Sequence, residues 1–305
     1  MRIALVPALA LTLVLPFASV AEERAIRHAQ GETAVEIPPA RPLVLDINAL
    51  DIIEALGIEP HGVLGSNLPP YLAGFADDRY VKVGTIFEPD YEAINAAGGD
   101  LMIVGGRSAS KYPELSQMLP TIDLTVAPEN YTESVKHNVA LIGEIFGKEA
   151  AAEELNAALD KKLATLSEKA ATAGTAMILV TNAGKVGVYG PTSRVGWIHR
   201  ELGFAPVESG IDDRFHQGDV ASFEYILEKN PDWLFVIDRD AAIGEAAPDG
   251  GAARATLDNE LVAGTKAWKE GHVIYLDPAA AYIASGGYTA LNTLLDQIAE
   301  ALDKG

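Results

Sequence analysis

Short apolar runs alternate with amphipathic stretches through the first half of the chain. The runs lie at residues 42–48, 61–66, 101–106 and 121–126. Apolar residues at helical spacing follow the first run, over 51–56, and this stretch ends at Gly57. Strands that alternate with helices in this way form mostly parallel sheets covered by helices. The first half therefore predicts one α/β lobe.

The second half of the chain shows a similar alternation. Residues 176–190 predict a hairpin that turns at Ala183-Gly184, and residues 272–277 predict a further strand. Helical spacing over 289–302 predicts a helix that closes the chain. A second α/β lobe is therefore expected.

One segment of the chain is present twice, at residues 91–107 and 223–239. YEAINAAGGDLMIVGGR and FEYILEKNPDWLFVIDR align without a gap. Five aligned pairs are identical, where unrelated segments of this length share about one: Glu92/Glu224, Ile94/Ile226, Asp100/Asp232, Val104/Val236 and Arg107/Arg239. Each copy predicts a short helix, a turn and a strand followed by an arginine. The duplication indicates that the two lobes are related.

The segment between the two halves, 129–173, is rich in Ala, Glu, Leu and Lys, and its apolar residues recur at helical spacing. One helix of about 40 residues in this segment would span roughly 60 Å at 1.5 Å per residue. A break into two helices at Gly147 is equally compatible with the sequence. We expect two Rossmann-like lobes bridged by a long α-helix. The first lobe covers 22–128 and starts with a polar leader at 22–39, and the second covers 174–305.

Residues 1–21 predict a signal peptide. Met1-Arg2 provides a positive start, residues 3–15 are apolar, and Ser19-Val20-Ala21 fits a small-x-small cleavage site. The chain contains no cysteine, which excludes disulfides, thiol catalysis, thiolate metal sites and a lipid on a cleavage-site cysteine. We expect export to the periplasm through a cleaved signal peptide, without a lipid anchor.

The charge and the missing motifs narrow the class of function. The formal net charge is −20, which argues against nucleic acid or anionic lipid as a partner, because both require clustered basic surface. The sequence also contains no GxSxG, HExxH, strand-following GxGxxG or GxxxxGK[ST] motif. A binding protein is therefore favoured over an enzyme.

Three arginines occupy positions where a strand leaves the core. Arg107 follows IVGG, Arg239 follows FVID, and Arg194 lies in GPTSR between a predicted strand and helix. Ligands of open α/β sheets bind beyond the carboxyl ends of the strands, so facing ends would create a cationic cleft. An arginine in such a place can also form an ordinary surface salt bridge.

Two further residues have side chains that suit metal coordination. His216 lies in the polar loop IDDRFHQGD, and Tyr282 lies in DPAAAYIASGG after the last predicted strand. A lone loop histidine can equally be solvated, and a lone tyrosine can be a packing residue.

These motifs resemble a known family. The lobe–helix–lobe plan, GGR, GPTSR and FEYILEKNPDWLFVIDR, with the later YLDP and ASGG, are similar to the periplasmic substrate-binding proteins of iron–siderophore ABC importers. Within that family, the chain resembles proteins that bind ferric catecholate siderophores of the enterobactin and petrobactin type. The resemblance runs from about residue 38 to the C-terminus and is most specific over 222–287.

The resemblance implies roles for the candidate residues. Arg107, Arg194 and Arg239 would bind an anionic ligand, and His216 and Tyr282 would be able to coordinate its ferric ion. The iron would arrive as a siderophore complex, with no permanently bound cofactor and no enzymatic step.

The family also implies a membrane partner, an inner-membrane ABC permease dimer, for a monomeric receptor. Glu92 and Glu224 match the pair of acids with which the family docks onto that permease. Each glutamate is also at a helix start, where the helix dipole alone favours a carboxylate.

The chemistry of ferric ion agrees with these assignments. Ferric ion prefers charged oxygen donors, and three catecholates leave the complex with three negative charges, which three arginines would offset. Two catecholates leave two of six coordination positions open, and the side chains of Tyr282 and His216 would suit them.

Three alternatives stay open from the sequence. The same fold could carry haem or a corrinoid, with Tyr282 or His216 as axial ligand. It could be a zinc or manganese receptor, although the six histidines are scattered. It could also be a chelatase-like enzyme on a related two-lobe fold.

Overall fold

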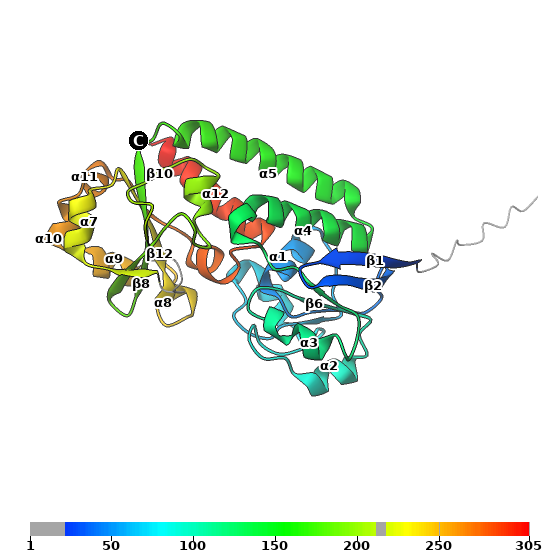
Figure 1. Ribbon diagram of the computed structural model, residues 1–305. Helices are drawn as coiled ribbons and strands as arrows, with labels where there is room; N and C mark the ends of the chain where they lie inside the picture. Colours follow the sequence, from blue (N-terminus) through cyan, green and yellow to red (C-terminus); the bar gives the residue numbers. More distant parts are fainter. Residues whose placement is uncertain (1–21, 212–217, 250, 305) are drawn as a thin grey trace, which may run out of the picture.

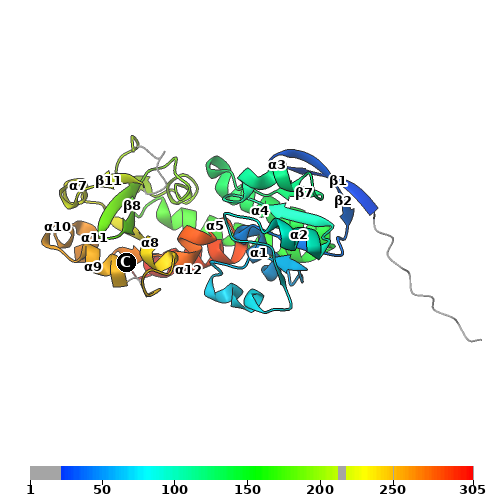
Figure 2. The same cartoon turned by 90° about the horizontal axis from the view of Figure 1, so that it is seen from below.

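Two α/β lobes and a layer of long helices make up the protein, as seen in a computed structural model that describes residues 22–211, 218–249 and 251–304. The N-terminal lobe and the C-terminal lobe lie at opposite ends of the molecule (Figure 1), and Figure 2 shows them side by side with α12 between them. The predicted α/β fold class is confirmed. The predicted signal peptide at 1–21 and the loop residue His216 lie outside the described residues.

The N-terminal lobe contains a five-stranded parallel sheet in the order β5-β4-β3-β6-β7. Its strands are β3 (Pro42–Val44), β4 (Gly62–Val63), β5 (Val81–Lys82), β6 (Leu101–Val104) and β7 (Thr121–Asp123). Its helical elements are α1 (Ile47–Ala55), η1 (Pro70–Ala76), α2 (Tyr91–Ala97), η2 (Ala109–Lys111) and α3 (Tyr112–Leu115). The four strands that the apolar runs predict are shorter than the runs. The first run predicts a strand over 42–48, but its last two residues already belong to α1, which begins before the expected 51.

The expected polar leader forms a β-hairpin. Strand β1 (Glu22–His28) pairs antiparallel with β2 (Gly31–Ile37). The hairpin lies against β7, since the Thr33 hydroxyl donates a hydrogen bond to the carbonyl of Thr121. Few side chains of this stretch are apolar, and only some of these, among them Ile26 and Val35, are buried. The alternation of apolar and polar residues is therefore too weak to predict strands from the sequence.

The C-terminal lobe contains a mixed sheet in the order β11-β9-β8-β12-β13, with β10 paired to β8. Its strands are β8 (Thr175–Asn182), β9 (Lys185–Tyr189), β10 (Ala205–Pro206), β11 (Asp219–Ala221), β12 (Trp233–Asp238) and β13 (Val273–Tyr275). The predicted hairpin is confirmed: β8 and β9 are antiparallel, and Ala183 and Gly184 have φ values of 48° and 73°, as a tight hairpin turn requires.

The helices of the C-terminal lobe surround this sheet. They are α6 (Trp197–Arg200), α7 (Phe223–Lys229), α8 (Arg239–Ala242), α9 (Gly251–Leu257), α10 (Glu260–Ala263) and α11 (Lys266–Glu270). A π-helix, η4 (Ala279–Ile283), precedes the last helix, α12 (Tyr288–Leu302). Helix α12 returns to the N-terminal lobe and packs on α1.

The connecting segment consists of η3 (Pro128–Asn130) and two helices, α4 (Tyr131–Phe146) and α5 (Glu149–Ala170). The break at Gly147 is therefore the alternative that the protein adopts, and its left-handed φ of 66° ends α4. Helices α4 and α5 pack together. Helix α5 runs back from the N-terminal lobe to the C-terminal lobe (Figure 1). At 22 residues it spans roughly 33 Å and is the long bridging helix.

The duplicated segments form the same unit in both lobes. Helices α2 and α7 are capped at their first turns by the equivalent side chains of Asp90 and Ser222. Both helices end in a left-handed residue, Gly98 at φ 57° and Asn230 at φ 43°. These matched caps support the common origin of the two lobes.

An aspartate of each copy fixes the start of the neighbouring central strand. The Asp100 carboxylate accepts hydrogen bonds from the backbone N–H groups of Ala40 and Arg41, just before β3. Asp232 accepts one from the N–H of Thr175, the first residue of β8. The identical aspartates of the repeat therefore have the same structural task.

A buried carboxylate ties α12 to the N-terminal lobe. Asp51 of α1 is fully buried and accepts hydrogen bonds from the N–H groups of Thr289 (2.7 Å) and Ala290 (3.0 Å), in the first turn of α12. The hydroxyl of Tyr71 donates a third at 2.6 Å. At Gly287 a Cβ atom would lie only 2.3 Å from Cγ of Asp51, so the close approach of the chain requires glycine.

A second carboxylate, this one from the C-terminal lobe, binds the start of a helix that packs on the N-terminal lobe. Glu201, directly after α6, accepts hydrogen bonds from the N–H groups of Tyr131 (2.9 Å) and Thr132 (3.0 Å) at the start of α4. The neighbouring Arg200 donates to the carbonyl of Pro128. Each lobe therefore holds the N-terminus of a long helix, where a carboxylate satisfies free N–H groups and matches the helix dipole.

Within residues 22–211, 218–249 and 251–304, no helix has both the length and the apolar composition needed to cross a membrane.

We predict that Asp51→Ala lowers the free energy of unfolding by roughly 2–4 kcal/mol, because it leaves two backbone N–H groups and the Tyr71 hydroxyl without their acceptor. Urea denaturation followed by circular dichroism measures the change. Glu54→Ala is the matched control, since Glu54 is an exposed acid on the same helix. Equal stability of the two variants would show that Asp51 does not hold α12 in place.

Candidate functional site

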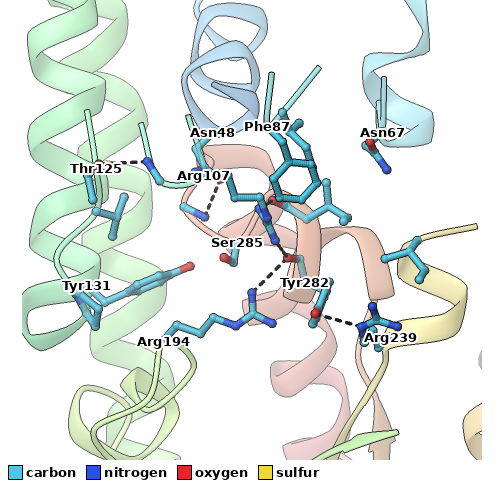
Figure 3. Close-up of a pocket in the computed structure, with 17 residues that line it drawn as sticks. Asn48, Asn67, Phe87, Arg107, Thr125, Tyr131, Arg194, Arg239, Tyr282 and Ser285 are labelled. Atoms are coloured by element: carbon cyan, nitrogen blue, oxygen red, sulfur yellow. Dashed lines mark hydrogen bonds between the residues drawn. The ribbon is translucent and has the colours of Figure 1, made fainter. Parts of the chain in front are cut away.

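A cavity of about 910 Å³ lies between the two lobes. The loops after β6 and β7 and the first residue of α4 form one side. The loop before α6, the start of α8, and η4 with the residues after it form the other (Figure 3). Polar and charged side chains line it together with apolar ones, and small-molecule sites likewise combine apolar walls with placed polar groups.

The three predicted arginines all line this cavity and converge on one short segment. Arg107 donates hydrogen bonds to the carbonyls of Ile283 (2.9 Å) and Tyr282 (2.7 Å). Arg194 donates to the same Tyr282 carbonyl at 3.3 Å, and Nε of Arg239 donates to the Tyr282 hydroxyl at 3.2 Å. The cluster combines side chains from both lobes, although the arginines are far apart in sequence.

Tyr282 is at the centre of this cluster, on the π-helix η4. Its ring centroid lies 4.3 Å from the guanidinium carbon of Arg194, 5.9 Å from that of Arg239 and 6.0 Å from that of Arg107. These distances allow cation–π attraction. A single-turn π-helix often marks a functional site, and here it brings the tyrosine between the three cations.

The pKa of Arg107 reflects its removal from water. Burial lowers the pKa of Arg107, and the positive charge of Arg194 lowers it further; the guanidinium nevertheless stays protonated at neutral pH. Burial also raises the pKa of Asp46 to about 6, against the stabilising charge of Arg107. A chain of net charge −20 thus concentrates partly buried positive charge in its cleft.

Glycines place the arginines. Gly106 has a left-handed φ of 49°, which glycine adopts without strain, and it turns the chain after β6 so that Arg107 enters the cleft. In GPTSRVG, a Cβ atom at Gly196 would lie 2.1 Å from the carbonyl oxygen of Pro191. The Ser193 hydroxyl also donates to the carbonyl of Gly190. The close approach of the chain at Gly196 and this hydrogen bond define the turn that presents Arg194.

The other predicted site residues lie elsewhere. His216 is outside the described residues, so its predicted role has no structural counterpart here. Glu92 and Glu224 are exposed at the first turns of α2 and α7 and do not line the cavity. No group of three or more His, Asp or Glu side chains in the described part of the chain is arranged to hold a metal ion.

Several lining residues were not among the sequence-based candidates. Asn48 and Ser285 line the cavity; Asn48 follows β3 at its carboxyl end, the same signal that identified Arg107. Phe87, at 56% exposure, lines it as well. Tyr131 lines it from α4, where its helical spacing is typical of an ordinary core residue.

Comparison with known proteins places the chain in a family. The profile of the periplasmic binding protein family matches residues 44–280. The petrobactin-binding protein YclQ of Bacillus subtilis is 35% identical over 288 residues, 93% of this chain and 89% of that protein. The ferric-anguibactin-binding protein FatB of Vibrio anguillarum is 32% identical over 282 residues, 90% of this chain and 85% of that protein.

Solved structures agree with the sequence matches. The crystal structure of YclQ superposes with a TM-score of 0.87 and covers 93% of this chain and 100% of that one. The periplasmic catecholate-siderophore binding protein VctP of Vibrio cholerae is 33% identical, with a TM-score of 0.86 and coverage of 92% and 100%. The chain therefore belongs to the periplasmic binding protein family.

Proposed function

We propose that this chain is a periplasmic receptor that binds a ferric siderophore, of the catecholate type, in the interlobe cavity and delivers it to an inner-membrane ABC permease. The observation that carries the proposal is the convergence of Arg107, Arg194 and Arg239 on one cavity between the lobes. Burial of a compact, multiply charged anion is strongly unfavourable unless charged partners offset its charge. Three partly buried arginines supply such partners through charge-assisted hydrogen bonds, so the cavity favours a ligand of this kind.

The dimensions and lining of the cavity support a ligand of this kind. About 910 Å³ is within the range of small-molecule sites. The arginines and hydroxyl groups supply donors, while Ile86, Phe87, Val126 and Ile243 supply apolar walls for aromatic rings. The names of YclQ, FatB and VctP, which refer to petrobactin, ferric anguibactin and catecholate siderophores, agree with it.

Direct coordination of iron by Tyr282 and His216 is part of the proposal. The Tyr282 hydroxyl is bonded to Nε of Arg239 (3.2 Å) and borders the cavity. A ligand with four oxygen donors leaves two positions of ferric ion open, which an imidazole and a phenolate would occupy. The iron is cargo in this account, not a resident cofactor, and no chemical step is required.

We also propose that Glu92 and Glu224 dock the receptor onto a two-fold permease. The glutamates are exposed on equivalent helices, one in each lobe. A partner with two related subunits would meet two related surfaces, and charge complementarity would fix their register. In this account the mature receptor is a monomer, and residues 1–21 direct its export.

Titration of the intrinsic tryptophan fluorescence with ferric catecholates, haem and cobalamin tests the ligand. We expect quenching at sub-micromolar concentration with ferric catecholates only. Arg194→Met should weaken that binding roughly 10- to 100-fold, since it removes a charge-assisted contact. Arg27→Met, which removes an exposed arginine on β1, is the control and should bind normally. Quenching by haem or cobalamin alone would contradict the proposal.

The absorption spectrum of the complex separates coordination from simple charge attraction. If Tyr282 and His216 bind the iron, the charge-transfer band of the ferric catecholate should shift on binding, and Tyr282→Phe should change both the band and the affinity. An unchanged band and affinity in Tyr282→Phe would refute direct coordination and leave the arginine site intact.

Charge reversal tests the docking surface. With the cognate permease in proteoliposomes, Glu92→Arg and Glu224→Arg should each reduce iron uptake severalfold, because repulsion replaces an ion pair. Ligand affinity should not change, since both residues lie outside the cavity. Glu153→Arg, at an exposed acid on α5 and on neither docking helix, is the control. Uptake as low in that control as in Glu224→Arg would argue against specific docking.

A further inference from the structure

Tyr131, the first residue of α4, is a buried tyrosine in the wall of the cavity. It is 3% exposed and lines the cavity together with Arg194 and Tyr282. Figure 3 shows its hydroxyl directed toward the space between Arg194 and Ser285. The hydroxyl of Tyr131 is therefore a candidate contact for a bound ligand.

The position of the Tyr131 ring is tightly fixed. The ring stacks on Trp197 with centroids 5.4 Å apart and planes inclined by 6°, and Trp197 is itself 1% exposed. The backbone N–H of Tyr131 donates to Glu201 at 2.9 Å. Because both its ring and its backbone are held in place, Tyr131 loses little further conformational entropy when a ligand binds. Such preorganisation favours a precisely oriented contact.

The Tyr131 hydroxyl has no hydrogen-bond partner within the described residues. Seven buried side-chain polar atoms there lack one, and two of them belong to residues that line the cavity: Oη of Tyr131 and Nε of Arg194. Buried polar groups without partners are uncommon and costly in folded proteins. Two such donors in one wall indicate that something other than the described chain satisfies them.

We propose that Tyr131 is a specificity-determining residue of the ligand site, whose hydroxyl donates a hydrogen bond to an anionic oxygen of the bound ligand beside Arg194. The inference rests on the proposed function and adds a recognition contact that is separate from iron coordination at Tyr282. The oxygen belongs to a carboxylate or catecholate group that reaches the back of the cavity, where the hydroxyl is screened from bulk water.

The protonation state of Tyr131 suits a donor. Burial raises its pKa, and the negative charge of Glu201 raises it further, against the opposing charge of Arg194. The hydroxyl is therefore neutral at physiological pH and gives a proton to the hydrogen bond. A ligand without an acceptor oxygen at this point would leave the donor unpaired, and sites of that kind discriminate strongly against such ligands.

Tyr131→Phe tests the inference with the ferric catecholate that binds the unaltered protein. The dissociation constant should rise roughly 10- to 100-fold, as expected for a lost hydrogen bond to a charged acceptor. The melting temperature of the ligand-free variant should be unchanged or higher, because the deleted hydroxyl has no partner in the described chain. Fluorescence titration and thermal unfolding with and without ligand measure the two quantities.

Two matched tyrosines define the comparison. Tyr71→Phe removes a hydroxyl that donates to Asp51 and should lower the melting temperature without ligand, which is the behaviour of a structural hydroxyl. Tyr112→Phe, in α3 and outside the cavity, should change neither quantity. Tyr131→Phe that keeps full affinity, or that loses stability as Tyr71→Phe does, overturns the inference while the proposed function stands. Failure of the unaltered protein to bind any ferric siderophore overturns both.

Discussion

The buried carboxylate of Asp51 at the start of α12 is the contact on which the geometry of the cleft depends. It joins α1 of the N-terminal lobe to the segment that carries η4, and with it Tyr282 and the backbone carbonyls that Arg107 contacts. Burial raises the pKa of Asp51 to about 6, and the hydrogen bonds from Tyr71, Thr289 and Ala290 oppose that rise by stabilising the carboxylate, whose charge matches the dipole of α12. Glu201 provides the reciprocal contact to α4. The two lobes are therefore fixed relative to each other through two helix N-termini.

This constraint explains how an acidic protein presents a cationic cleft. The arginines belong to two lobes and three separate segments, two loops and the start of α8, and only the fixed arrangement of the lobes brings them around Tyr282. In the protein alone these donors bond to carbonyl and hydroxyl oxygens, Arg239 also lies 3.9 Å from the Asp240 carboxylate, and Nε of Arg194 has no partner among the described residues. An anionic ligand supplies stronger acceptors, so binding energy comes from groups that are already in place.

Much of this arrangement follows from local sequence signals. The helix, turn and strand of the duplicated α2–β6 and α7–β12 units and the arginines that follow them could be predicted, because helix and strand ends depend on near neighbours. The break at Gly147 stayed open, since helical spacing continues on both sides of it. The roles of Asp51 and Tyr131 could not be foreseen, because their partners are distant in sequence and both residues have the spacing of an ordinary helix. The predicted role of His216 stays a prediction.

Crystal structures with and without a ferric catecholate siderophore would show whether the arginine cluster binds the ligand between fixed lobes. We expect the iron complex to lie among Arg107, Arg194 and Arg239, with Asp51 and Glu201 still bound to their helices. The lobes should rotate relative to each other by less than about 20°, since a larger hinge closure would break these contacts. A complex bound outside the cleft, or a rotation well above that value, would contradict this arrangement.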